Sequence, residues 1–193
     1  MSEYTLANKY TLGVKETVQL PITGLNATLV WHAPVDLDLM FFYRATDGRE
    51  GAVFSPNIKK GDGTTNGTLG TTSAFPFISL SGDEGVDESE GAKSEEGRIE
   101  NLSEMAEIHI FAVNWSDAEK GADTTFSSYD GLVQVMDDSG EHNFDVPLSS
   151  TEHGYFAHLA TIKGDGSMTR VDKVMGIGAD FFENIPAAKL LFV

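Results

Sequence analysis

Short runs of β-branched, aromatic and large aliphatic residues recur along this chain, and turn residues separate them. Runs of this length and composition are typical of β-strands. Residues 108–115 are apolar almost throughout, which favours a central strand covered on both faces. The predicted strands are residues 14–20, 27–32, 37–43, 52–54, 108–115, 132–136, 143–148, 155–163 and 168–175.

Glycine-containing turns connect several of these strands as hairpins. The turns are predicted at residues 46–49, 137–141 and 164–167. Helical periodicity is weak, and the two helix candidates are residues 117–121 and 179–191, the second interrupted by Pro186. The sequence therefore predicts an all-β fold, a two-sheet β-sandwich with a few short helices, in a single domain spanning residues 1–193.

Two stretches interrupt the strands and are predicted to be long loops, at about residues 61–73 and 81–101. The first is rich in Gly and Thr. The second carries much of the negative charge, with eight acidic residues and two basic ones between Asp83 and Glu100.

The whole chain of 193 residues has 30 acidic against 13 basic side chains, a net charge of −17. Such a balance argues against nucleic-acid binding, which needs clustered Lys and Arg, and against an anionic membrane surface. Cysteine is absent, which excludes disulfides and thiolate chemistry. The N-terminus has no basic stretch followed by an apolar run, so we expect a cytoplasmic protein without direct membrane insertion.

Asp36 and Asp38 open the strand predicted at residues 37–43. Side chains two apart in a strand point to the same face, so the two carboxylates are expected to share one face. Leu37 and Leu39 begin the other face, while Met40 continues the Asp face as an apolar residue. Because an uncompensated buried charge is costly, the pair is expected at the rim of the sandwich, where a loop can meet it.

The acidic loop is the natural partner for that pair. Its acids repel one another unless a cation neutralises them, and Ca²⁺, which takes 6–8 oxygen ligands, suits this chemistry. Mg²⁺ demands a tighter octahedron. A solvated, acidic loop without a bound ion is the alternative from composition alone.

The sequence gives less support for other kinds of functional site. Asp36 and Asp38 could form a glycosidase dyad, although such acids normally come from different segments. His109 and His158 lie in strand-like runs and are predicted to be half-buried, and the two tryptophans, Trp31 and Trp115, are predicted to pack in the core. No catalytic site is predicted.

Four stretches together resemble the TerD-like tellurium-resistance and bacterial stress-protein family. These are Trp31 with Asp36-Leu37-Asp38-Leu39; Ser81-Gly82-Asp83-Glu84 with the acids that follow; Glu107 to Trp115; and the hairpin that ends in Phe144-Asp145-Val146-Pro147-Leu148. The likeness covers roughly residues 14 to 178 and identifies the chain as a divergent member.

The resemblance implies a calcium-binding β-sandwich that binds one or two Ca²⁺ ions. Carried over position by position, the implied metal ligands are Asp36, Asp38, Asp83, Glu84, Asp87, Glu95 and Glu96. It also implies a non-enzymatic stress-response module whose partners are other stress proteins or further copies of itself. A calcium-dependent sugar-binding sandwich is the main alternative, and a hydrolase that uses Asp36, Asp38 and a metal-bound water, with His32 nearby, is the second.

Overall fold

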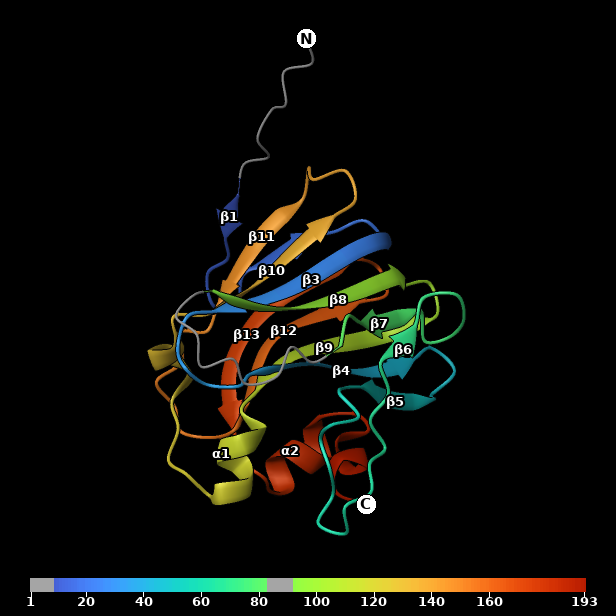
Figure 1. Cartoon of the computed structure of the whole chain (residues 1–193). Helices are drawn as coiled ribbons and strands as arrows, with labels where there is room; N and C mark the ends of the chain where they lie inside the picture. The colour runs from blue at the N-terminus through green and yellow to red at the C-terminus, as the bar shows by residue number, and fades with distance from the viewer. Residues whose placement is uncertain (1–8, 83–91) are drawn as a thin grey trace.

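The computed structural model describes residues 9–82 and 92–193, whose strands form two facing β-sheets (Figure 1). Within this part of the chain, sheet A has seven strands in the order β1-β11-β10-β3-β8-β7-β6, and sheet B has six in the order β2-β13-β12-β9-β4-β5. The predicted two-sheet β-sandwich is confirmed.

Sheet A consists of β1 (Tyr10–Thr11), β11 (Asn143–Pro147), β10 (Leu132–Asp137), β3 (Thr23–Trp31), β8 (Lys93–Asn101), β7 (Ile78–Leu80) and β6 (Gly70–Thr71). Sheet B consists of β2 (Thr17–Gln19), β13 (Ser167–Met175), β12 (Phe156–Lys163), β9 (Met105–Val113), β4 (Asp38–Ala45) and β5 (Glu50–Val53).

The predicted strands and hairpins correspond to elements of these sheets. The three predicted turns join β4 to β5, β10 to β11 and β12 to β13, and each pair is antiparallel. Strand β9, predicted to be central and covered on both faces, lies between β12 and β4. Its residues contribute to two separate apolar clusters, one on each face of sheet B.

The larger cluster, the inner core, fills the space between the sheets. Strand β4 shows how alternation builds it, since Leu39, Phe41 and Tyr43 lie in the inner core. Met40 and Phe42 point to the opposite face of sheet B and join the second cluster, the outer core. The expected division of the strand into two faces is therefore confirmed.

Helices close the outer core. Helix α2 (Ala179–Asn184) and the 3₁₀ helix Ala188–Leu191 (η2) lie on either side of Pro186, the residue that interrupts the predicted C-terminal helix. Phe181 of α2 is fully buried and its ring stacks on that of Phe156 at 4.4 Å. Helix α1 (Trp115–Lys120) follows β9, and a further 3₁₀ helix, η1, spans Phe126–Tyr129. None of the helices among the described residues is long and apolar enough to cross a membrane.

The prediction of one long loop over residues 81–101 is wrong for its second half, because Lys93–Asn101 forms β8. This strand pairs with β3 on one side and β7 on the other. Its inward positions include Lys93, Glu95 and Gly97, with Ile99 as the aliphatic residue among them. The hydrophobic alternation that marks a half-buried strand is therefore missing from the sequence. The predicted loop at residues 61–73 contains the short strand β6 near its end.

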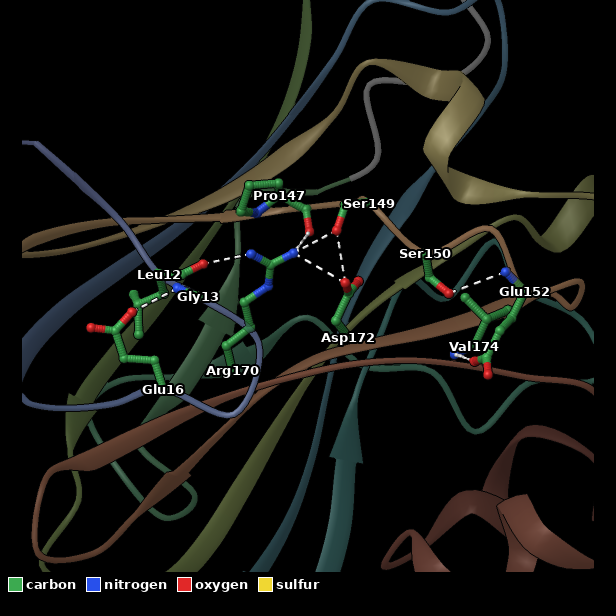
Figure 2. A network of polar contacts seen from close by, with 10 residues as sticks. All are labelled: Leu12, Gly13, Glu16, Pro147, Ser149, Ser150, Glu152, Arg170, Asp172 and Val174. Atoms are coloured by element: carbon green, nitrogen blue, oxygen red, sulfur yellow. Dashed lines mark hydrogen bonds and ion pairs between the residues drawn. The ribbon is translucent and has the colours of Figure 1, made fainter.

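The N-terminal segment crosses from one sheet to the other. Strand β1 pairs in parallel with β11 of sheet A, and β2 pairs with β13 of sheet B. Arg170 of β13, 5% exposed, holds the crossing in place, with Nη1 donating to the carbonyl oxygen of Leu12 (Figure 2). Its Nη2 reaches the end of β11, donating to Ser149 Oγ at 2.6 Å, and it also pairs with Asp172 Oδ2 at 3.1 Å. One buried guanidinium thus ties both sheets and the crossing segment together.

Candidate functional site at the acidic end of the sandwich

The link from β3 to β4 brings the predicted aspartates to one end of the sandwich. Trp31, the last residue of β3, is 1% exposed, as its predicted place in the core requires. Its Nε1–H donates to the carbonyl oxygen of Val35 at 2.8 Å and so fixes the turn just before Asp36. We call the end of the sandwich that holds Asp36, Asp38 and Glu95 the acidic end.

Asp38 is the first residue of β4, opposite Val113 at the end of β9. It is 6% exposed and begins the strand face that Met40 continues into the outer core. Asp36 precedes the strand, so strand alternation does not set its direction. It is half-buried and lines a hollow of about 160 Å³ together with Asn114 and Asp117.

A polar network borders this hollow and orients Asp117. Asn114, 1% exposed, is the N-cap of α1, and its side-chain oxygen accepts from Asp117 N at 3.0 Å. Asn114 Nδ2 donates to Asp117 Oδ2 and to the hydroxyl of Tyr129, each at 3.0 Å. Thr124 Oγ1 donates to the same carboxylate oxygen. Sequence reasoning missed these residues, although an Asn followed three positions later by an Asp is a recognisable helix start.

Glu95 joins the two sheets at the acidic end. It points inward from β8, is 5% exposed, and its Oε2 accepts a hydrogen bond from Leu39 N at 2.6 Å. A buried main-chain N–H needs an acceptor, and here a carboxylate of the opposite sheet supplies it. Glu95, predicted as a metal ligand, therefore has a structural task here, and the proposal below does not use it as a ligand.

Glu96 lies on the opposite face of β8 and is exposed. Its main-chain N donates to Ser81 Oγ at 3.2 Å, next to a hollow on the outer face of sheet A. The structure thus places two neighbours of the predicted ligand set on different faces of a strand and does not bring Glu96 to Asp36 and Asp38.

Asp83, Glu84 and Asp87 lie outside the described residues. The residues that flank their segment are described, however. Ser81 N donates to the carbonyl oxygen of Glu96 at 2.8 Å, and Lys93 pairs with Trp31 at the end of β3. Of the two described flanks, Lys93 therefore lies at the acidic end, and Ser81 lies beside Glu96 on β8.

The acidic end also contains a cation of its own. Lys93 is 8% exposed, and its ammonium group donates to the carbonyl oxygen of Ala33 at 3.4 Å. Within residues 9–82 and 92–193, no three side chains of His, Asp and Glu are grouped so that they could hold a metal ion. The described part of the site therefore supplies two candidate carboxylates, Asp36 and Asp38, and further ligands have to come from elsewhere.

Glu95→Ala should destabilise the fold by about 2 kcal/mol, because the buried N–H of Leu39 would lose its acceptor. Urea unfolding, followed by circular dichroism, measures this change. The loss is expected to be the same in Ca²⁺ and in EDTA, since the Leu39 contact is between protein groups. An equal stability of Glu95→Ala and the wild type would contradict the structural role.

A second group of ionisable side chains lies away from the acidic end, on the outer face of sheet B. His109 Nδ1 and His158 Nε2 are 3.2 Å apart, and both residues are 6% exposed. They were predicted to be half-buried and are buried. Phe111 stacks on His158 at 4.6 Å, and Thr161 Oγ1 lies 3.0 Å from His158 Nε2.

Burial lowers the pKa of both imidazoles. The pKa of His158 falls to about 3, first through desolvation and second through repulsion from His109. The pKa of His109 is also lowered by burial, against the opposing effect of Glu107, whose carboxylate lies 3.6 Å from Nε2. The pair is therefore neutral at pH 7.

Comparison with known proteins adds no relative: the chain matches no known family model and no curated protein. The fold and the site define a two-sheet β-sandwich with buried carboxylates at one end.

Proposed function

We propose that this protein binds Ca²⁺ at the acidic end, through Asp36 and Asp38 together with the acids at positions 83, 84 and 87. The observation that carries the proposal is the position of Asp38. Asp38 is 6% exposed at the acidic end, where Lys93, just after the acidic segment, pairs with Trp31 at the end of β3. Asp38 starts β4 at the same end of the sandwich as Asp36, so its carboxylate is a candidate oxygen ligand for a hard cation.

The chemistry of the donors suits a hard cation. The side chains proposed as ligands all offer carboxylate oxygens, which Ca²⁺ and Mg²⁺ prefer. Two described carboxylates do not fill a Ca²⁺ shell of 6–8 oxygens, and the proposal assigns further ligands to the acids at positions 83, 84 and 87. When bound, the ion would neutralise the crowded charge and connect the start of β4 to the link between β7 and β8. Asp117, held by Asn114 and Thr124 beside Asp36, borders the same hollow.

The proposed biological role is that of a non-enzymatic stress-response module of the tellurium-resistance type. Its support is the sequence resemblance described above. In this role, metal binding would control contacts with other stress proteins or with a second copy of the chain. Because the described acidic end contains no thiol, the proposal is one of metal-dependent association and not of direct tellurium chemistry.

Thermal unfolding in Ca²⁺ and in EDTA tests the metal site. A ligand at a hundred times its Kd adds about 2.7 kcal/mol to the free energy of unfolding. For a chain of this size that corresponds to a rise in Tm of roughly 5 to 10 °C. Asp38→Asn keeps the size of the side chain and removes one charge, and it should abolish the rise.

Two control variants separate the site from general charge effects. Glu183→Gln removes one charge from the exposed side of α2 and should leave the Ca²⁺-dependent rise intact. Glu95→Gln should lower Tm in both solutions and retain most of the rise. Equal Tm values for the wild type in Ca²⁺ and EDTA, with Asp38→Asn behaving in the same way, would refute calcium binding here.

A further inference from the structure

Another hollow, which we call the Trp115 hollow, is lined by residues of α1 and of the C-terminal segment. Figure 1 shows α1 and the C-terminus at the same end of the molecule. Its volume is about 360 Å³, within the range of small-molecule sites. Four separate parts of the chain form its wall: the loop after β5, helix α1, the link between β13 and α2, and the C-terminal residues around η2. The lining residues used below are Lys59, Lys60, Trp115, Glu119, Ile177 and Phe192.

The body of the hollow is apolar and aromatic. Trp115 was predicted to pack in the core, but it is half-buried and lines this hollow, with its ring 5.9 Å from that of Phe192. Ile177, in the link between β13 and α2, is 46% exposed beside them. An exposed aliphatic residue that adjoins an aromatic wall is a common feature of ligand sites.

The polar edge of the indole already has a partner. Trp115 Nε1–H donates to Glu119 Oε1 at 3.1 Å, one turn further along α1. This contact also engages the acidic residue among those that line the hollow. The ring itself is therefore left to contact an apolar group of a ligand.

Two adjacent lysines give the hollow a charge opposite to that of the protein. The chain has 30 acidic and 13 basic residues, yet Lys59 and Lys60 outnumber Glu119 in this lining. The ammonium group of Lys59 donates to the carbonyl oxygen of Pro56, and an ammonium has three donors, so it can also bind an anion. A ligand whose apolar part contacts Trp115 and Ile177 can thus bring a negatively charged group close to the two lysines.

From this arrangement we infer that the Trp115 hollow binds a small amphipathic anion, a carboxylate carried on a ring-sized or medium-chain apolar body. The apolar body lies against Trp115, Ile177 and Phe192, and the carboxylate pairs with Lys59 and Lys60. The site shares no residue with the proposed calcium site and does not depend on it.

The test uses a fluorescent probe of the same chemistry. Anilinonaphthalene sulfonate has two aromatic groups and one anionic group, and N-phenylnaphthylamine has the same body without the charge. The wild type should bind the sulfonate saturably at one site. Lys59→Gln/Lys60→Gln should weaken sulfonate binding by about fivefold or more and change binding of the neutral probe by less than about twofold.

Two further variants locate the site. Ile177→Ser removes exposed apolar surface, leaves the fold intact because Ile177 is 46% exposed, and should weaken both probes. Lys15→Gln/Lys163→Gln removes the same total charge from exposed positions elsewhere and should bind both probes as the wild type does. Circular dichroism confirms that each variant is folded.

Displacement then tests the proposed ligand class. Decanoate should displace the sulfonate from the wild type at a concentration about fivefold or more below that needed by decanol, which has the same chain without the charge. Any of three results overturns the inference: unchanged sulfonate binding by the double lysine variant, unchanged binding of both probes by Ile177→Ser, or equal displacement by decanoate and decanol.

Discussion

Arg170→Met is expected to destabilise this protein by about 3 to 5 kcal/mol, the usual cost of removing one partner from a buried ion pair. The guanidinium is 5% exposed and the carboxylate side chain of Asp172 is 9% exposed. Without Arg170, that charge would remain buried without its cation, and the carbonyl oxygens of Leu12 and Pro147 would each lose a donor (Figure 2). Urea unfolding monitored by circular dichroism gives the change.

A double-mutant cycle identifies the cause of that loss. Asp172 has a φ of 54°, a conformation that asparagine accepts well, so Asp172→Asn is a conservative change. The double variant Arg170→Met/Asp172→Asn should lose less than the sum of the two single losses, because neither charge is then left unpaired. Lys173→Met, which breaks the exposed pair with Asp180, is the control and should cost at most about 1 kcal/mol. Additive losses would contradict a coupled, buried pair.

Acid should unfold this protein at a higher pH than protonation of its carboxylates alone would, because His109 and His158 are buried as a neutral pair. The contact between their ring nitrogens is 3.2 Å long and can hold one proton between them. Two protonated rings would direct two N–H groups at each other. Glu107 raises the pKa of His109, but burial outweighs this effect and the net pKa is lowered. Arg44 lowers the pKa of His109 further, and Lys173 lowers that of His158.

The direction of the pH dependence follows from the lowered pKa. In the unfolded chain His158 has a pKa near 6.5, whereas in the folded protein its pKa is about 3. Above pH 6.5 His158 is neutral in both the folded and the unfolded state, so its full contribution to the free energy of unfolding is present. As the pH falls from 6.5 toward 3, the unfolded state takes up a proton that the folded state does not bind, so the stability decreases.

A glutamine at position 158 removes this titration while retaining a donor and an acceptor. Between pH 7 and pH 4.5, His158→Gln should lose about 2 to 3 kcal/mol less of its free energy of unfolding than the wild type loses. His32→Gln changes an exposed histidine and should follow the wild type. Identical pH dependence of His158→Gln and the wild type would show that the buried pair does not control acid stability.

Most of the sandwich was readable from the sequence because its strands follow two apolar faces. Strand β4 is the clearest case, since Leu39 and Phe41 serve the inner core while Met40 and Phe42 serve the outer one. Strand β8 could not be recognised, because three of its inward positions hold lysine, glutamate and glycine. At Gly97 the reason is steric: a Cβ there would lie 2.4 Å from the ring of Phe41, so no larger residue fits.

The candidate site was predictable only in part. The place of Asp38 at the start of a buried strand followed from local pattern. The role of Glu95 as an acceptor could not be predicted in this way, because its partner, Leu39 N, is 56 residues away and in the other sheet. The burial of His109 and His158 was missed for the same reason, since the two rings contact each other across 49 residues of sequence.

The crossing of the N-terminal segment has a consequence for synthesis. Val18 pairs with Met168 and Tyr10 pairs with Phe144, so each partner follows much later in the sequence. Strands β1 and β2 therefore cannot pair before β11 and β13, which follow much later in the sequence, have been made. Until then β1 and β2 have no strand to pair with, and completion of both sheets depends on these long-range contacts.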